Sequence, residues 1–280
     1  MRLFLILAML WTPVAMHAGL LDLLPLKRIE RKMLYPLSPI EVAPATVGLP
    51  NTQVMLHPID KGHLVVWSVP AKGRTKARVL YFHGNAGNLA NRAQCFRLLR
   101  DQGFEVVAMS YRGSSGSSGV PSEDTITKDA LALFETLTDK HPNTTSIDLI
   151  LYGESLGSAV AIAVLHALPA NLRPAGVILE APFTSTPAMA RAMMDIPDNL
   201  IARIEDRWDS LSRAKLLTLP MLIIHGAQDE VTPQTMGRAI FNAAPSQDKN
   251  FISVQGASHS GTWRSDTMPK LWRFIRTYGG

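Results

Sequence analysis

The chain of 280 residues has little cysteine and little charge, and it contains no repeat or low-complexity tract. Its single cysteine, Cys95, excludes an intrachain disulfide. No group of His and Cys residues has the spacing of a metal site, so the sequence implies no metal and no cofactor. Charged residues make up 18% of the chain and hydrophobic residues 46%, which excludes a largely disordered protein. A chain of this length and composition is typical of one large domain with a sizeable core.

Basic residues outnumber acidic ones, giving a formal net charge of +5. They are dispersed and lack an interleaved aromatic platform, which argues against a nucleic-acid partner. Four of them cluster just after an apolar N-terminal segment: Lys27, Arg28, Arg31 and Lys32. Such a cluster beside a membrane can contact anionic lipid headgroups, although a solvated helix face explains it equally well.

Residues 1–24 have the pattern of a secretory signal peptide or a membrane anchor. Arg2 precedes an apolar run at 3–11, and small residues surround Ala18, as at a signal cleavage site. Residues 19–24 prolong the apolar character, so a retained anchor is the alternative, and an arm packed on the domain is a third. We therefore expect an exported protein, periplasmic or secreted, or a membrane-anchored one. For a retained anchor, the positive-inside rule would instead favour the basic cluster on the cytoplasmic side.

From Val79 onward, apolar β-rich segments alternate with helical ones, and this alternation predicts an α/β fold over residues 25–280. We expect a mostly parallel twisted sheet with helices on both faces, including helices at 91–101 and 123–138. The stretch near Val54 and residues 63–69 favour antiparallel edge strands.

Between residues 184 and 218 the alternation stops, and Met and Pro are frequent. We interpret this stretch as a small helical lid insertion over the carboxyl edge of the sheet, where open α/β sheets bind ligands. Met side chains adapt to irregular apolar surfaces, so Met193 and Met194 are candidates for substrate binding. Ordinary packing of a connecting helix pair is the alternative.

The most informative motif is Gly-Glu-Ser-Leu-Gly at 153–157. An apolar β-rich segment, 146–152, precedes it, and a segment rich in Ala and Val, 158–165, follows it. This strand–turn–helix context is that of a nucleophile elbow, in which a strained turn exposes the serine hydroxyl. The motif predicts that Ser155 is a catalytic nucleophile.

A serine nucleophile needs a base and an acid, and where this elbow occurs the acid and then the histidine follow the serine in the chain. Asp229 lies just past an apolar strand-like segment that ends at Gly226, and Glu230 beside it is a competing candidate. His259 lies in a glycine-containing loop after the last predicted strand, 251–254. We expect Asp229 to orient His259 and His259 to activate Ser155.

Acyl transfer also needs backbone N–H groups that receive the negative charge of the oxyanion. One predicted donor is Leu156, the residue after the nucleophile. The other is Asn85, with Ala86 as the alternative, in a glycine-containing loop after the predicted strand 78–82. His83 in the same loop is expected to brace it.

Together, the segments HGNAGN (83–88), YRG (111–113), GESLG (153–157), HGAQDE (225–230) and GASH (256–259) resemble the α/β-hydrolase superfamily. The resemblance runs from about Val65 to the C-terminus. The sequence is similar to that of small serine hydrolases that often carry an N-terminal membrane segment and are described as esterase-, thioesterase- or serine aminopeptidase-like.

The resemblance and the motifs imply hydrolysis of a carboxylic ester or thioester through an acyl-enzyme, with a small-molecule or lipid-like acyl substrate. A serine aminopeptidase is the alternative enzyme and needs an anionic group for a substrate amine, for which Glu154, Glu180 and Asp195 are candidates. A non-catalytic binding protein on the same fold is the third hypothesis.

Overall fold

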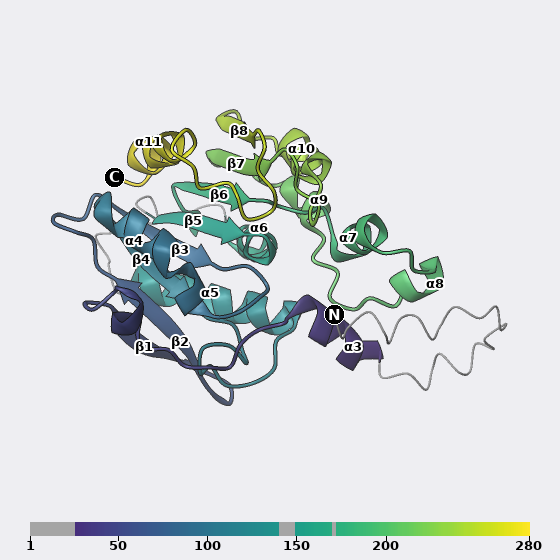
Figure 1. The fold of residues 1–280 in the computed structure, drawn as a ribbon, viewed down its shortest axis with the longest axis horizontal. Helices are drawn as coiled ribbons and strands as arrows, with labels where there is room; N and C mark the ends of the chain where they lie inside the picture. Colours follow the sequence, from purple (N-terminus) through teal and green to yellow (C-terminus); the bar gives the residue numbers. More distant parts are fainter. Residues whose placement is uncertain (1–25, 140–148, 170–171) are drawn as a thin grey trace.

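The computed structural model describes residues 26–139, 149–169 and 172–280 (Figure 1). The predicted signal or anchor, residues 1–24, lies outside the described residues. Among the helices of the described ranges, none has the length and apolar character needed to cross a membrane.

Within these ranges, eight strands form one sheet in the order β1-β2-β4-β3-β5-β6-β7-β8. β1 pairs antiparallel with β2 and β2 antiparallel with β4, and all later neighbours are parallel. The mostly parallel α/β sheet predicted from the sequence is therefore confirmed. Of the two antiparallel strands, β1 forms the edge and β2 lies inside it. The strands are β1 (Gln53–Ile59), β2 (Gly62–Val69), β3 (Ala77–Phe82), β4 (Phe104–Met109), β5 (Leu149–Glu154), β6 (Gly176–Glu180), β7 (Met221–Gly226) and β8 (Lys249–Val254).

Helices cover both faces of the sheet because the buried side chains of the inner strands β2 to β7 alternate between two hydrophobic clusters. On β3, Leu80 points into one cluster and Val79 into the other. The first cluster is covered by α5 (Glu123–Asp139), α6 (Leu156–Ala167) and α10 (Gln234–Ala243). The second is covered by α4 (Ala93–Asp101) and α11 (Met268–Tyr278).

The helix predicted at 91–101 begins as a short 3-10 helix, η3 (Leu89–Arg92), and continues as α4. The helix predicted at 123–138 is α5. The strand predicted at 146–152 is observed from Leu149, and residues 146–148 lie outside the described ranges.

Residues 184–218 contain three short helices, α7 (Thr186–Met193), α8 (Asp198–Ile201) and α9 (Ser210–Ala214). α7 and α8 project from the body of the molecule (Figure 1), whereas Trp208 and Ala214 belong to the core. The N-terminal helix α3 (Leu26–Leu34) is tied to this region, since Glu30 accepts hydrogen bonds from the N–H groups of Glu205 (3.2 Å) and Asp206 (2.8 Å).

Candidate active site

Ser155 occupies the tight turn between β5 and α6, in a backbone conformation that side chains rarely adopt (φ 51°, ψ −112°). The glycines around it are needed for close approach. A Cβ on Gly153 would lie 2.3 Å from the Gly157 carbonyl oxygen, and a Cβ on Gly157 would lie 1.9 Å from that of Phe82. The turn therefore needs glycine at both positions, and it presents Ser155 at the carboxyl edge of the sheet.

The structure brings the three predicted side chains Ser155, His259 and Asp229 into one hydrogen-bonded chain. His259 Nε2 lies 3.1 Å from Ser155 Oγ, and His259 Nδ1 lies 2.8 Å from Asp229 Oδ2. They come from the ends of β5, β8 and β7, which meet at the same edge because the strands are parallel. The competing acid Glu230 is exposed, whereas the carboxylate that hydrogen-bonds to His259 is that of Asp229.

Asp229 is buried, and both of its carboxylate oxygens accept hydrogen bonds. Its Oδ1 accepts from the N–H groups of Val231 (2.9 Å) and Thr232 (2.8 Å), and its Oδ2 accepts from the Thr232 hydroxyl (2.9 Å). Burial acts to raise the pKa of Asp229, but hydrogen bonds from His225, His259 and Thr232 outweigh it and hold this pKa well below its usual range. Asp229 is therefore a carboxylate that faces His259 with a full negative charge.

His259 responds to that charge. Its partial burial acts to lower the pKa of the imidazole, but the hydrogen bond and charge of Asp229 prevail and raise the pKa above its ordinary value. A second histidine, His225, is fully buried, and its Nε2 lies 2.7 Å from the Thr232 carbonyl oxygen and 3.4 Å from Asp229 Oδ2. Only His259 bridges the carboxylate and the serine.

The predicted oxyanion donors lie on two adjoining segments. Leu156 is the first residue of α6, where a backbone N–H has no acceptor within the helix. Asn85 is half-buried in the loop after β3. This loop packs against the start of α6, since a Cβ on Gly157 would also lie 2.9 Å from the His83 carbonyl oxygen.

The loop that carries Asn85 is braced from several sides, as expected for His83. His83 is fully buried, its Nδ1 lies 2.6 Å from the Gly84 carbonyl oxygen, and its own carbonyl accepts from the Tyr111 hydroxyl (2.6 Å). Burial, aided by the nearby charge of Arg92, lowers the pKa of His83 to about 3, so its imidazole stays neutral. At the far end of the loop, the Gly87 carbonyl accepts from the Ser38 N–H (2.8 Å).

Comparison with known proteins agrees with this arrangement. Residues 73–212 and 208–262 match the family model described as "Serine aminopeptidase, S33". The chain belongs to this family of α/β hydrolases. A protein of Mycobacterium tuberculosis is 30% identical over 234 residues, which are 82% of this chain and 80% of that protein.

A second relative is the lysophosphatidylserine lipase of Mus musculus, 29% identical over 235 residues. The match covers 74% of this chain but 58% of the lipase. Among solved structures, an alpha-beta hydrolase from Vibrio vulnificus superposes with a TM-score of 0.72 at 18% identity, covering 91% of this chain and 94% of that one. At this identity the likeness speaks for the fold alone.

Two carboxylates of this hydrolase lie beside the site, of which Glu180 is buried and Glu154 half-buried. Glu154 and Glu180 end β5 and β6 as register partners. Glu154 accepts two hydrogen bonds from Arg92 and one from the Tyr81 hydroxyl (3.0 Å). Burial acts to raise its pKa, but the Arg92 charge outweighs burial and lowers it.

Sequence reasoning weighed these two carboxylates only as partners of a substrate amine and missed Thr232 altogether. The sequence did place Glu154 and Glu180 at the ends of two strands. Because parallel strands bring their carboxyl ends to one edge of the sheet, this position could have indicated that both carboxylates lie near Ser155. Nothing in the sequence pattern distinguishes Thr232 from an ordinary turn residue.

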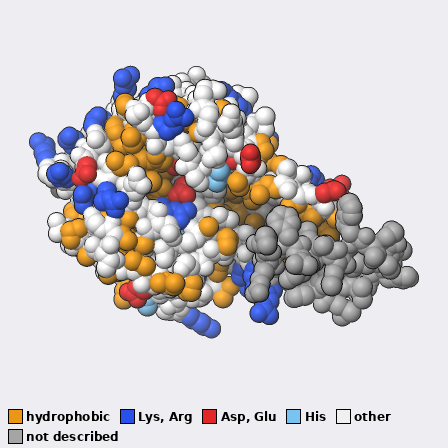
Figure 2. All heavy atoms as spheres, viewed as in Figure 1, with side chains coloured by type: hydrophobic (Ala, Val, Ile, Leu, Met, Phe, Trp, Pro, Cys, Tyr) orange, Lys and Arg blue, Asp and Glu red, His pale blue; other side chains and the backbone are white. Residues whose placement is uncertain are grey.

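Met193 and Met194 lie at the end of α7, and 45% of the Met193 side chain is exposed. On the face shown in Figure 2, hydrophobic side chains gather next to a histidine where the body meets the helical segment. The role of both methionines in substrate binding stays a prediction.

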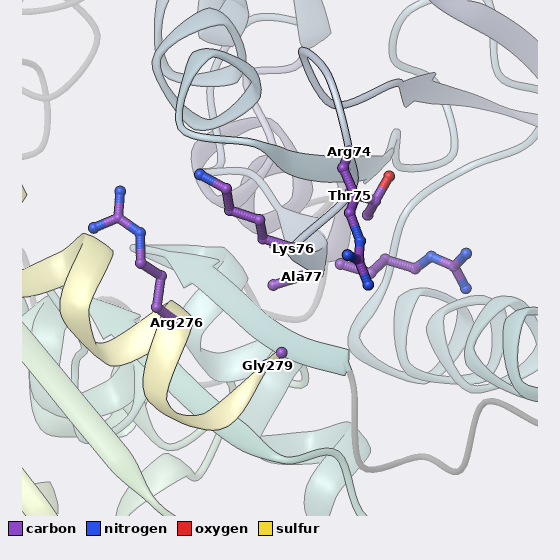
Figure 3. A pocket seen from close by; sticks show the side chains of 8 residues that line it. Arg74, Thr75, Lys76, Ala77, Arg276 and Gly279 are labelled. Atoms are coloured by element: carbon purple, nitrogen blue, oxygen red, sulfur yellow. The ribbon is translucent and has the colours of Figure 1, made fainter.

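A separate cavity of about 700 Å³ lies at the start of β3, at the opposite end of the strand from the HGNAGN loop. Its basic side chains diverge: Lys76 and Arg276 extend away from Arg74 (Figure 3). Within the described residues, no three His, Cys, Asp or Glu side chains come together as metal ligands would.

Proposed function

We propose that this hydrolase cleaves a carboxylic ester or thioester through a covalent acyl-enzyme formed on Ser155. The observation that carries the proposal is the position of His259 between two partners, 3.1 Å from Ser155 Oγ and 2.8 Å from Asp229 Oδ2. With Nδ1–H donating to Asp229, Nε2 is the free basic nitrogen that faces the serine hydroxyl.

In the first half-reaction, Ser155 Oγ attacks the carbonyl carbon while His259 Nε2 takes its proton. The N–H groups of Leu156 and Asn85 stabilise the oxyanion, and the imidazolium then protonates the leaving alcohol or thiol. In the second half-reaction, His259 activates a water molecule that releases the acid. Asp229 keeps its charge throughout and stabilises the imidazolium.

A lipid-like acyl substrate is the substrate class we favour. The lysophosphatidylserine lipase of Mus musculus matches 74% of the length of this chain. The α7–α8 region, which follows β6 in the chain, also exposes an apolar side chain, Met193. Both observations support an acyl chain lying against the helical segment.

An aminopeptidase, the activity in the family description, needs a free anion to bind a substrate amine. Two of the three candidates are already engaged: Glu154 pairs with Arg92, and Glu180 is buried and accepts three hydrogen bonds. Asp195 is exposed on the connection after α7. This favours an ester or thioester over a peptide.

The test compares wild type, Ser155→Ala and a control, Ser212→Ala, whose serine is exposed on α9. We expect Ser155→Ala to lose labelling by a fluorophosphonate probe and at least about 10⁴-fold in ester hydrolysis, with the control unchanged. Full labelling of Ser155→Ala would overturn the proposal. A panel of p-nitrophenyl esters, an acyl thioester and an aminoacyl-anilide separates esterase, thioesterase and aminopeptidase, and inactivity of wild type on all of them favours a binding protein.

We also propose that the protein is exported or membrane-anchored through residues 1–24, because of their apolar run after Arg2. The measurement is the N-terminal sequence of the protein recovered from cell fractions. A chain that starts near residue 19 supports cleavage, and an intact chain in the membrane fraction supports an anchor. An intact chain in the cytoplasmic fraction overturns both.

A further inference from the structure

Glu180 touches both segments that carry the reacting side chains. It ends β6 and is 5% exposed. Its backbone carbonyl accepts the N–H of Ser155 (2.8 Å). Its carboxylate accepts from Trp263 Nε1 (3.0 Å) and from the Thr262 hydroxyl, which follow His259 by four and three residues. One residue thus links the nucleophile turn to the histidine loop.

The histidine loop has few other anchors near His259. Its neighbours Ser258 and Ser260 are exposed, and the nearest backbone hydrogen bond, from the Gly261 N–H to the Ser258 carbonyl, is long at 3.4 Å. Thr262 is buried, and its carbonyl accepts from the Thr267 hydroxyl (2.5 Å). Before His259 the loop is held at the buried Ala257, whose carbonyl accepts from the Gln228 N–H (2.9 Å). The Glu180 carboxylate is therefore the anchor of the loop on the side that follows His259.

The hydrogen bonds of Glu180 suit an ionised carboxylate. Trp263 Nε1–H and the hydroxyls of Thr262 and Tyr152 (2.6 Å) all donate, and a carboxylate only accepts. Among the described residues, no Lys, Arg or His forms an ion pair with Glu180, in contrast to Glu154 and its Arg92. Burial and the nearby Glu154 charge raise the pKa of Glu180, and the three donors act against that rise.

We propose that Glu180 is a positioning residue that holds the His259 loop against the Ser155 turn and whose negative charge favours the imidazolium of His259. This rests on the proposed serine hydrolase function. The titratable groups that interact electrostatically with Glu180 or His259 are Tyr81, Cys95, Tyr152, Glu154 and Asp229, and Glu154 is itself paired with Arg92.

Glu180→Gln and Glu180→Ala separate charge from position. Gln keeps an oxygen that accepts from Tyr152 and Trp263 but removes the charge, so we expect the acid limb of the kcat/KM–pH profile to move to lower pH with kcat within about threefold. Ala removes the anchor, and we expect kcat to fall by about 10²-fold with KM within about threefold, the loss typical of a misplaced catalytic group. Glu105→Gln on β4 is the matched control and should leave kcat and the pH profile unchanged.

Trp263→Phe tests the same link from the loop side and does not depend on the folding of Glu180→Ala. It should lower kcat severalfold, and its loss should not multiply with that of Glu180→Ala, because both variants remove the hydrogen bond between Trp263 and Glu180. Wild-type kcat in Trp263→Phe together with a wild-type pH profile in Glu180→Gln would overturn the proposal. If Ser155→Ala is inactive in the same assay, that outcome rejects Glu180 alone, whereas an active Ser155→Ala rejects the proposed function itself.

Discussion

The Arg92 guanidinium donates two hydrogen bonds to the Glu154 carboxylate, one from Nε (3.1 Å) and one from Nη2 (2.9 Å). Glu154 directly precedes the serine of the turn, and Arg92 Nη1 also donates to the Ala86 carbonyl (2.6 Å) in the loop that carries Asn85. The ion pair therefore connects the two segments that hold the predicted oxyanion donors, and it neutralises a half-buried carboxylate whose other hydrogen-bond partner is the uncharged Tyr81 hydroxyl.

Arg92→Ala should destabilise the protein strongly. Breaking a largely buried pair leaves an uncompensated charge, and we expect the free energy of unfolding to fall by about 3 kcal/mol. Urea denaturation measures this loss. Arg100→Ala is the matched control, because Arg100 pairs with Asp101 near the surface and such pairs contribute about 0–1 kcal/mol. Equal losses in the two variants would contradict a structural role for the Arg92 pair.

Asp229→Asn and Glu230→Gln distinguish the two adjacent acids. The amide introduced by Asp229→Asn would disturb the His259 tautomer that leaves Nε2 free, so we expect kcat to fall by about 10⁴-fold. Glu230 is exposed, and the hydrogen bond to His259 Nδ1 is made by Asp229, so Glu230→Gln should keep kcat within about twofold. Ester hydrolysis at saturating substrate measures both. A large loss in Glu230→Gln with a small one in Asp229→Asn would reverse the assignment.

The sheet and the three reacting side chains could be predicted because each is encoded locally. Ser155 is marked by its flanking glycines, and Asp229 and His259 by their places after apolar strands and by their order. The contacts that Glu180, Trp263 and Arg92 make around these side chains could not be predicted, because they depend on the pairing and packing of strands and loops that are distant in the sequence. The burial of Trp208, whose indole N–H donates to the Tyr35 hydroxyl (2.9 Å), could not be predicted for the same reason, because the two residues are distant in the sequence.

The pH profile should report the charge of Asp229 on His259. Because the pKa of His259 is raised, the acid limb of kcat/KM should have its midpoint above the ordinary histidine value of about 6.5. The interaction with Asp229 that raises the His259 pKa also stabilises the fold, so His259→Ala should lower the free energy of unfolding over a limited pH range. The raised His259 pKa contributes stability that is full below about pH 6.5 and is lost as pH rises through the folded-state pKa.

The depressed pKa of Asp229 contributes stability that is present above about pH 3.9 and is lost as pH falls through the folded-state pKa. The stability difference between wild type and His259→Ala should therefore be largest between about pH 4 and 6.5, where His259 is protonated and ester hydrolysis is slow. Urea titrations across pH measure it. A difference that grows above pH 8 would contradict the pairing.

Met193→Ala and Met194→Ala test the helical segment as the wall of an acyl site. Removing apolar side chains that contact an acyl chain costs about 0.8 kcal/mol for each CH₂ that loses its contact, so kcat/KM should fall for long-chain esters and change little for acetate. Met33→Ala is a matched control, since Met33 on α3 is equally exposed at 45%. A chain-length series of p-nitrophenyl esters is the measurement. Equal losses at every chain length would show that Met193 and Met194 act through the packing of α7 and not through contact with substrate.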